Sequence, residues 1–232
     1  MKKTFLLSCL MLAAMPVMAA YTGHVYVDKN KNGVFDQSEK PLAGIKVSDG
    51  LNVVETAADG SFTLPGHERE RFIFITTPSG YKTFNRHYHK IEKKQSGYDF
   101  GLIPYSGRIR KDGSHRYIHI TDTEIFNTEN HADWVNNVHD YARNEQAAFI
   151  IHTGDLCYEK GLKAHIKLMN TENMDCPVFY CIGNHDLVKG KYGEELFESI
   201  YGPVYYSFDA GNVHYVVTPM PGGDHAPGYT SD

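Results

Sequence analysis

After residue 20 the chain runs through short segments in which apolar and polar residues alternate. This two-residue period is typical of half-buried β-strands, and Gly, Asp and Asn separate the segments. The segments that show it lie at 23–27, 45–47, 53–56, 61–64, 71–77 and 98–102. Between them there is no helical period of useful length. The pattern predicts a small all-β sandwich over residues 21–105.

After residue 115 apolar strands alternate with amphipathic helices. Strands are predicted at 117–121, 147–152 and 177–182, helices at 130–146, 162–169 and 194–201, and a hairpin at 204–208 and 213–218. Apolar strands that alternate with helices are typical of a parallel sheet covered on both faces. The sequence therefore predicts a layered α/β core of βαβ units over residues 115–232. A charged, glycine-containing linker at 106–114 joins this core to the sandwich.

The first twenty residues have the organisation of a secretory signal peptide. Lys2 and Lys3 precede an apolar segment at 5–14, and small residues at 17–20 offer cleavage positions. A membrane anchor is the alternative, but the apolar segment is shorter than the roughly 20 residues that span a bilayer. We therefore expect an exported protein, located in the periplasm or outside the cell.

The composition is that of an ordinary globular protein, with 41% hydrophobic and 22% charged residues. The formal net charge is −5, and removal of the first twenty residues would take away two lysines and no acid. An acidic surface does not favour nucleic acid or anionic lipid as a partner. No segment after the signal peptide has the length and hydrophobicity of a membrane span. The sequence leaves the oligomeric state open.

Three cysteines remain after removal of the signal peptide: Cys157, Cys176 and Cys181. An odd number in an exported protein means at least one free thiol or an intermolecular disulfide. Cys176 and Cys181 flank a predicted buried strand. We expect buried thiols that pack as small hydrophobic side chains.

Three of the predicted strands in the second half end in polar residues. These ends read Asp122-Thr123-Glu124, Gly154-Asp155 and Gly183-Asn184-His185-Asp186. In a parallel sheet the carboxyl ends of the strands form one ligand-binding edge. Carboxylate and amide oxygens, together with an imidazole, are ligands for divalent metal ions. The sequence therefore predicts one or two metal ions at this edge.

Each motif also has a plainer interpretation when it is taken alone. A Gly-Asp pair after a strand is usually a turn, and an Asp-x-Glu is usually a solvated strand end. The Gly-Asn-His-Asp tetrapeptide is rarer, because four turn-forming or ionisable residues directly follow a buried strand. Their joint order in successive βα units is far more specific than any one of them.

The series resembles the calcineurin-like metallophosphoesterases, whose motifs are Asp-x-His, Gly-Asp and Gly-Asn-His-Asp/Glu, followed by further histidines. The resemblance covers residues 116–218. It implies a metallophosphoesterase-type α/β fold and a phosphoester substrate. It also implies two divalent metal ions (Mn, Fe, Zn or Mg) that activate a metal-bound hydroxide for attack on phosphorus.

The same resemblance implies roles for individual residues. Asp122 would bind the first metal ion, Asp155 would bridge both ions, and Asn184 would bind the second. His185 would stabilise the transition state or protonate the leaving oxygen, and Asp186 would orient its ring. Bound cations would also supply the positive charge that the acidic protein lacks at a phosphate site.

Two features depart from the family pattern. Glu124 stands where the family has the first-motif histidine, which favours harder ions such as Mn or Mg. The later metal-binding histidines are missing, since His214 lies within a predicted strand and His225 lacks a paired histidine. We therefore expect the sequence to be incomplete at its C-terminal end, and this chain alone to turn over little substrate.

These departures leave a second hypothesis open. The chain would then be a calcium-stabilised exported binding or surface module whose phosphoesterase-like domain is inactive. A serine or cysteine nucleophile has little support, because Cys157 lies near the motifs without a partner histidine at a recognisable spacing.

Residues 28–39 fit the spacing of a twelve-residue calcium loop. Its oxygen donors are Asp28, Asn30, Asn32, Asp36 and Glu39, with Gly33 at the sharp turn. Because the loop follows a strand, it is not a helix-flanked EF-hand. It resembles the loop of Sdr-type B repeats and of the N-terminal modules of some exported calcineurin-like phosphoesterases. The alternative is a solvated turn that caps the strand without a metal ion.

Overall fold

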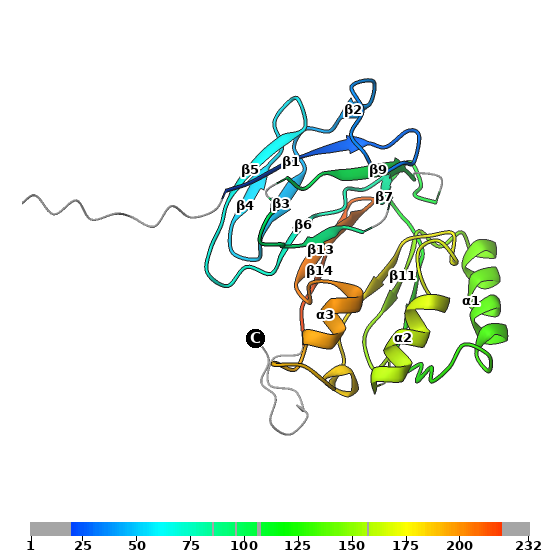
Figure 1. Cartoon of the computed structure of the whole chain (residues 1–232). Helices are drawn as coiled ribbons and strands as arrows, with labels where there is room; N and C mark the ends of the chain where they lie inside the picture. Colours follow the sequence, from blue (N-terminus) through cyan, green and yellow to red (C-terminus); the bar gives the residue numbers. More distant parts are fainter. Residues whose placement is uncertain (1–19, 85, 96, 106–107, 157, 220–232) are drawn as a thin grey trace, which may run out of the picture.

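The structure is a computed structural model of the chain (Figure 1). It describes residues 20–84, 86–95, 97–105, 108–156 and 158–219. The predicted signal peptide, apart from Ala20, lies outside the described residues, as do Cys157 and His225. No helix within the described ranges is both long enough and apolar enough to cross a bilayer.

The N-terminal domain consists of two sheets. The first contains β1 (Ala20–Val27), β2 (Lys40–Pro41), β5 (Ser61–Pro65), β7 (Tyr81–Thr83) and β9 (Phe100–Pro104). The second contains β3 (Lys46–Ser48), β4 (Val53–Glu55), β6 (Phe72–Ile75) and β8 (Tyr88–Lys90). In the first sheet β1 is central, antiparallel to β5 along its first half and parallel to β9 along its second. In the second, β6 lies between β3 and β8.

Alternation along the strands builds the core of this domain. In β5, Phe62 and Leu64 are buried while Thr63 between them is exposed. They meet Val25 from β1 and Ile73 from β6 in one apolar cluster. Burying each such side chain contributes about 1.5–3 kcal/mol relative to leaving it exposed. The predicted β-sandwich is confirmed in outline.

Three of these strands, β2, β7 and β8, lie outside the segments that the sequence pattern predicts. Strand β2 holds a proline, and β7 and β8 are three residues long and carry Lys82 and Lys90. None of them shows hydrophobic alternation, so a pattern search has nothing to detect. Pairing with neighbours distant in sequence determines these strands.

The C-terminal domain is built on a parallel sheet in the order β10-β11-β12, formed by Tyr117–Ile120, Phe149–His152 and Val178–Tyr180. Its helices are α1 (Ala132–Asn144), α2 (Tyr158–Leu168) and α3 (Glu195–Tyr201), with the short 3₁₀ helix η1 at Asn184–Asp186. The hairpin consists of β13 (Tyr206–Ala210) and β14 (Val213–Val217). Helix α2 begins four residues before the predicted start, because its first turn is polar and lacks the apolar period.

The two faces of this sheet have different covers. Ile150 of β11 packs in a cluster with Val135 of α1 and Ala164 of α2. Its neighbour Phe149 points the other way and lies edge-on to Phe208 of β13, with ring centroids 5.0 Å apart. Helices therefore cover one face and the β13–β14 hairpin covers the other. This arrangement confirms the layered α/β core.

The two domains share an aromatic core. Phe72, Phe74 and Tyr88 of the N-terminal domain belong to the same buried cluster as Phe149 and Phe208 of the C-terminal domain. A bridge between Thr77 and Phe208 continues β6 into the hairpin. Figure 1 shows β13 beside β6. The predicted linker at 106–114 is therefore only one of the connections between the domains.

A bidentate ion pair also joins the domains. Nε and Nη2 of Arg71 donate to the two carboxylate oxygens of Glu198, at 3.0 and 2.8 Å. The hydroxyl of Tyr192 donates to the same carboxylate at 2.7 Å. Glu198 is 3% exposed, so its charge depends on these donors. Parallel N–H···O bonds of this kind are among the stronger polar contacts in proteins.

Neither Cys176 nor Cys181 is in a disulfide. Cys176 is fully buried and Cys181 is half-buried. Burial raises the pKa of each thiol to about 11, so both are protonated at neutral pH. The prediction of a buried thiol that packs as a small hydrophobic side chain is confirmed for Cys176. Cys181 packs against the aromatic cluster but is only partly buried.

Replacement of Glu198 by Gln is predicted to lower the free energy of unfolding by about 2 kcal/mol, because a half-buried guanidinium loses its counter-charge. Urea denaturation measures the change. The matched control is Glu55→Gln, which breaks an exposed ion pair with Lys46 and is expected to leave the midpoint unchanged. Equal midpoints for Glu198→Gln and the wild type would contradict the prediction.

His165 is a buried imidazole between α2 and α3. Its Nδ1 lies 3.1 Å from the hydroxyl of Tyr201, which itself donates to the carbonyl of Leu162. Nδ1 is therefore the protonated nitrogen, and the buried Nε2 has no hydrogen-bond partner. Burial, together with His152 nearby, lowers the pKa of His165 well below its usual value.

This depressed pKa predicts a loss of stability in acid. Below pH of about 6.5 the unfolded chain binds a proton at His165 that the folded chain refuses, so stability is complete above that pH and falls as the pH drops further. One such histidine contributes a slope of at most about 1.4 kcal/mol per pH unit. We expect urea denaturation between pH 7 and 5.5 to show that the free energy of unfolding falls less steeply with pH in His165→Gln than in the wild type. An unchanged slope would oppose the prediction, and His214→Gln, at an exposed position, is the control.

Candidate functional site

The three predicted strand ends meet at the carboxyl edge of the parallel sheet. The N–H of Asp122 donates to the carbonyl of Gly154 at 3.2 Å, which links the loops after β10 and β11. Gly154 in turn lies against Gly183 after β12. A Cβ on Gly154 would come within 2.6 Å of the Cα of Gly183. Glycine is therefore required where the second and third loops touch.

Asp155 and His185 link the second motif to the third. The backbone N–H of His185 donates to Oδ1 of Asp155 at 3.2 Å, and its ring Nδ1 lies 4.0 Å from Oδ2. A Cβ on Gly183 would lie 2.2 Å from Oδ1 of the same carboxylate. The Asp155 carboxylate of the second motif therefore contacts the third motif. His185 remains accessible, with 41% of its side chain exposed.

Asp186 is fully buried and shapes the loop that follows β12. Its Oδ2 accepts the N–H of Gly183 at 2.9 Å, and its own N–H donates to the carbonyl of Gly183 at 3.2 Å. Nδ1 of His185 is buried and has no hydrogen-bond partner. The predicted role of Asp186 in orienting the His185 ring therefore stays a prediction. Its observed contact holds the 3₁₀ turn in shape.

Four non-glycine residues near these strand ends have left-handed backbone. They are Asp122 (φ 52°), Glu124 (φ 46°), Asp155 (φ 54°) and Tyr158 (φ 45°). Such a conformation costs roughly 1–2 kcal/mol for most residues, although aspartate tolerates it better. Backbone strain of this kind gathers at functional sites, where the surrounding structure holds it in place.

His152 was not assigned a role from the sequence, yet it ties two of the loops together. Its Nδ1 accepts the N–H of Gly154 at 3.3 Å, so Nε2 carries the proton and donates to Oγ1 of Thr123 at 3.0 Å. Burial lowers the pKa of His152 to about 3, against the opposing effect of Asp122. The neutral ring therefore connects the first and second motifs. A histidine at the end of an apolar strand, directly before Thr-Gly-Asp, was the available signal.

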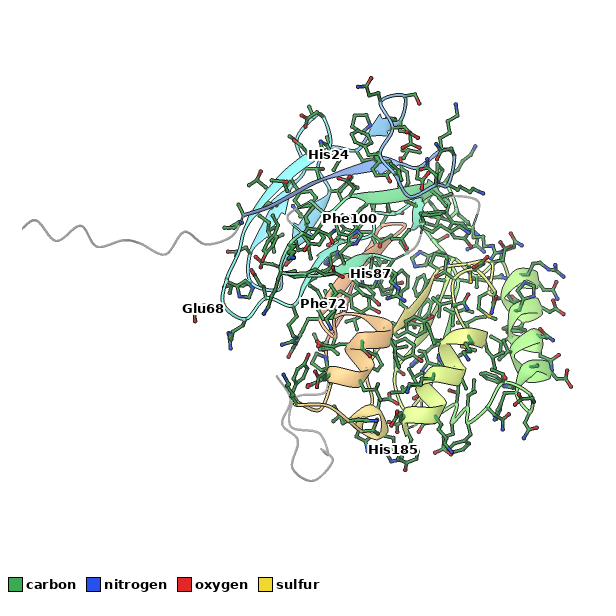
Figure 2. All side chains as sticks on the ribbon, in the orientation of Figure 1. His24, Glu68, Phe72, His87, Phe100 and His185 are labelled. Carbon is green, nitrogen blue, oxygen red and sulfur yellow. The ribbon has the colours of Figure 1, made fainter. Side chains whose placement is uncertain are left out.

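The rim of the site carries an aromatic ring and a lysine. The ring of Tyr158 stacks on His185 with centroids 5.6 Å apart and planes 13° apart. Lys189 pairs with Glu159 on the first turn of α2 at 3.1 Å. Figure 2 shows His185 at the end of the molecule farthest from the N-terminal domain.

The donor set at this edge suits divalent cations. Asp122, Asp155 and Asn184 supply hard oxygen ligands from three loops, and Glu124 adds an exposed carboxylate. Among the described residues, none of these carboxylates forms an ion pair with lysine or arginine. The oxygens of Asp122, Glu124 and Asp155 do not all lie within 4.8 Å of one another. Such a spread is compatible with sites whose two metal ions are about 3.5–4 Å apart.

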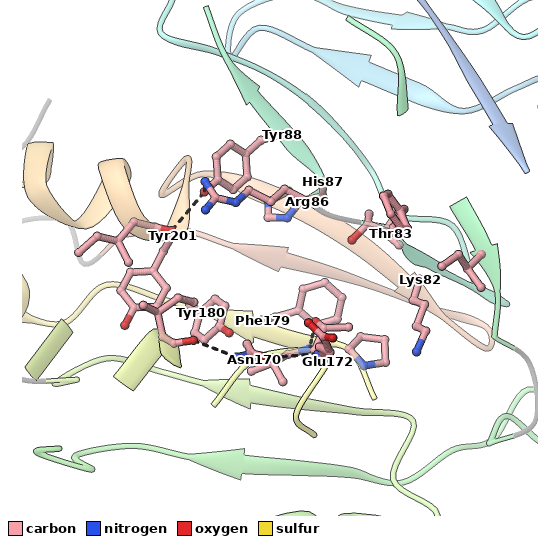
Figure 3. A pocket seen from close by; sticks show the side chains of 18 of the residues that line it. Lys82, Thr83, Arg86, His87, Tyr88, Asn170, Glu172, Phe179, Tyr180 and Tyr201 are labelled. Atoms are coloured by element: carbon pink, nitrogen blue, oxygen red, sulfur yellow. Dashed lines mark hydrogen bonds between the residues drawn. The ribbon is translucent and has the colours of Figure 1, made fainter. Parts of the chain in front are cut away.

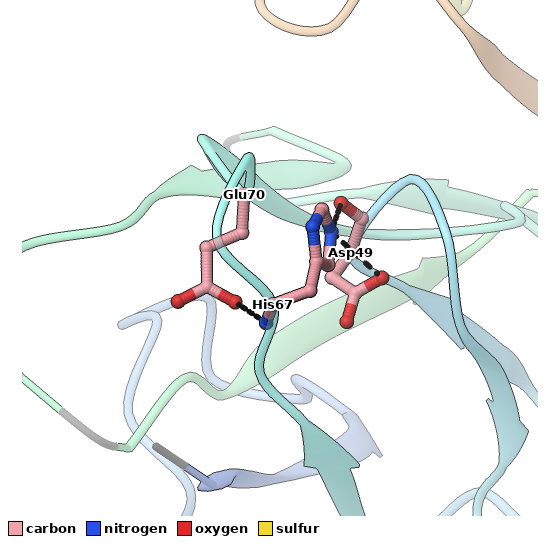
Figure 4. Close-up of side chains that lie close together, drawn as sticks. All are labelled: Asp49, His67 and Glu70. Atoms are coloured by element: carbon pink, nitrogen blue, oxygen red, sulfur yellow. Dashed lines mark hydrogen bonds and ion pairs between the residues drawn. The ribbon is translucent and has the colours of Figure 1, made fainter. Parts of the chain in front are cut away.

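A tighter cluster of ligand-type atoms lies in the N-terminal domain (Figure 4). Asp49, His67 and Glu70 each bring one such atom within 4.8 Å of the others. Nδ1 of His67 accepts the N–H of Arg69, so Nε2 carries the proton and faces Asp49. The carboxylate of Asp49 accepts two backbone N–H groups from the turn that follows it. The cluster is a satisfied hydrogen-bond network that closes a loop.

The twelve-residue loop after β1 folds around its predicted oxygen donors. Asp28 accepts the N–H groups of Asn32 and Gly33. The side-chain amides of Asn30 and Asn32 donate to Asp36, at 2.7 and 3.3 Å. Gly33 has φ 72°, as the sharp turn requires. The carboxylate and amide groups of the loop therefore converge.

Two of the loop's carboxylates are buried without a cation beside them. Asp28 is 1% exposed and Glu39 is 7% exposed. Glu39 accepts the N–H groups of Lys29 and Asp36, and no lysine or arginine pairs with either carboxylate among the described residues. The buried hydroxyl of Tyr26 next to Asp28 has no partner. Burial, then the charges of Asp28 and Glu39, raise the pKa of Tyr26. A concentration of buried negative charge with an orphaned hydroxyl fits a bound cation.

Two protein-family models match the chain. A family model described as the N terminal of calcineurin-like phosphoesterase matches residues 29–104. A second model, described as calcineurin-like phosphoesterase, matches residues 115–226. No curated protein matches the chain. The two matches lie in the order of the two domains and together cover most of the sequence. The chain therefore belongs to the calcineurin-like phosphoesterase family.

Proposed function

We propose that the chain hydrolyses phosphoesters at a dinuclear metal site on the carboxyl edge of β10, β11 and β12. Membership of the family supports metal-dependent phosphoester hydrolysis in general. The observation that carries the proposal is the convergence of three loops, in which Asp122 bonds to Gly154 and Asp155 bonds to His185. Residues 62 positions apart in sequence, Asp122 and Asn184, thereby reach one edge.

Four residues would hold the metal ions: Asp122, Glu124, Asp155 and Asn184. When bound, two divalent ions neutralise charge on the phosphate and lower the pKa of a coordinated water. Asp155 is the natural ligand to share, because its carboxylate lies between the loops of the second and third motifs. The carboxylate of Glu124, in place of a histidine, favours Mn or Mg over softer ions.

His185 would act on the phosphate or on the leaving oxygen. Its ring is partly exposed, lies beside Asp155 and is backed by Tyr158. The stacking limits rotation of the imidazole. A ring N–H can therefore point at a bound oxyanion without reorganisation. Asp186 supports this geometry because its carboxylate holds the turn that carries His185.

The signal-peptide organisation of residues 1–20 supports an exported protein, active in the periplasm or outside the cell. The proposal also includes a calcium ion in the N-terminal domain, bound by Asp28, Asn30, Asn32, Asp36 and Glu39. Ca²⁺ takes six to eight oxygen ligands, and its charge would offset that of the buried Asp28 and Glu39. The ion would be structural, since the loop belongs to the N-terminal domain while His185 lies at the far end of the molecule.

Substitution of His185 by Ala is predicted to lower kcat for p-nitrophenyl phosphate or bis-p-nitrophenyl phosphate by about 10²–10⁴. The assay uses the full-length protein with Mn²⁺, and chelation by EDTA should abolish the rate until Mn²⁺ is restored. His24→Ala, in the N-terminal domain, is the control and should keep the wild-type rate. No rate in the wild type, or the same rate in His185→Ala, would favour an inactive domain in a calcium-stabilised binding module.

Calcium is predicted to raise the Tm of the wild type by about 5 °C or more at concentrations well above its Kd. The double variant Asp28→Asn with Glu39→Gln should lose this increase, while its Tm in EDTA stays equal to that of the wild type or rises, because two buried charges are removed. Thermal unfolding followed by circular dichroism gives both values. Asp59→Asn, in an exposed turn of the same domain, should retain the calcium effect. An equal loss of Tm in calcium and in EDTA would refute the metal loop.

A further inference from the structure

A cavity lies between the two domains, away from the candidate active site. Its volume is about 600 Å³, within the range of small-molecule sites. One wall comes from residues 82–84 and 86–88, and the other from residues 170–172 and β12 (Figure 3). The cavity is lined by β12 itself, whereas His185 follows the end of that strand. Figure 2 shows His87, which lines the cavity, well separated from His185.

Aromatic rings make up much of the wall. Phe179, Tyr180 and Tyr201 line one side and Tyr88 lines the other. The hydroxyls of all three tyrosines donate to backbone carbonyl groups. Their polar atoms are therefore engaged by the protein, and the rings offer apolar surface to a ligand. Flat apolar groups bind well against such surfaces.

The same cavity carries an excess of positive charge. Lys31, Lys82 and Arg86 line it, and none of them forms an ion pair with a carboxylate within the part of the chain that the structure describes. Lys82 lies over the ring of Tyr105 and Arg86 over that of Tyr88. Glu172 is the one acidic residue among the described lining residues. This is unusual in a protein with a net charge of −5.

His87 adds a polar group without a partner. Its ring packs against Tyr206 with centroids 4.5 Å apart, and its buried Nε2 forms no hydrogen bond. Burial and the charge of Arg86 lower the pKa of His87 to about 3, so the ring is neutral. A buried nitrogen without a partner costs about 1–3 kcal/mol, and the neutral ring adds no charge to the cavity wall.

We propose that this cavity is a non-catalytic binding site for a small organic oxyanion with a flat aromatic body. The oxyanion lies at the guanidinium of Arg86, and the body lies against Phe179 and Tyr180. Lys82, at the other end of the cavity, adds to the positive potential that attracts the anion. Because its two walls belong to different domains, the ligand links the N-terminal domain to the phosphoesterase domain. The phosphate or carboxylate group and the ring are both needed for tight binding.

Isothermal titration calorimetry with phenylphosphonate tests the site. This probe carries a ring and an oxyanion, and its P–C bond resists phosphoester hydrolysis. The titration is done in EDTA, so that binding through metal ions is excluded. Inorganic phosphate, which lacks the ring, should bind at least 10-fold more weakly. The double variant Lys82→Gln with Arg86→Gln should weaken phenylphosphonate binding at least 10-fold, and the wild-type Tm should rise with the probe.

The matched control is Arg110→Gln with Lys111→Gln, which removes the same two charges from an exposed segment and should leave the affinity unchanged. Asp155→Asn, at the other edge of the sheet, should also bind normally. Circular dichroism verifies that each variant is folded, and Arg86→Glu alone replaces the double variant if that one is not. No binding at millimolar probe, wild-type affinity in the double variant, or loss of affinity in Asp155→Asn or the matched control would each overturn the proposal.

Discussion

The close contact between the loops after β11 and β12 is the constraint on which the site depends. A Cβ at Gly154 or at Gly183 would collide with the backbone of the other loop or with Asp155. Only two residues without side chains let the carboxylate of one motif accept the N–H of the next. Asp155, with its left-handed backbone, lies at this contact, and Asp122 bonds to Gly154 through its N–H. The geometry of the edge is thus a matter of backbone sterics first, and of ligand chemistry second.

The shared aromatic core gives the two domains a common framework. Phe208 of the hairpin stacks on Phe179 of β12 with centroids 3.5 Å apart, and the backbone next to it pairs with Thr77 from the N-terminal domain. The sheet that carries the site therefore rests on a hairpin that itself rests on the first domain. The Arg71–Glu198 pair fixes the same junction with directional bonds. Rigid support of this kind is what a precisely positioned metal site needs.

Elements with a strong local signal could be predicted from the sequence, and contacts between distant segments could not. The alternation in β5, the apolar run of β11 and the helical period of α1 each reflect which face is buried, so the pattern is sufficient. Strands β7 and β8 lack such a pattern and exist because of their partners. In the same way, Asp155 and Asn184 were found because strand ends carry ligands. The position of His152 at a strand end was visible in the sequence, but its contacts with Thr123 and Gly154 were not. The cavity beside His87 needs both domains, and no single segment of sequence contains it.

The hairpin's position between the domains has a consequence for the order of folding. The N-terminal domain emerges first during synthesis, and among the described residues its core around Val25 and Leu64 uses none beyond Leu102. It can therefore assemble early and present Phe72 and Phe74 as a preformed apolar wall. The β13–β14 hairpin, which is synthesised later, then packs onto that wall. The N-terminal domain thereby acts as a template for the folding of the C-terminal domain.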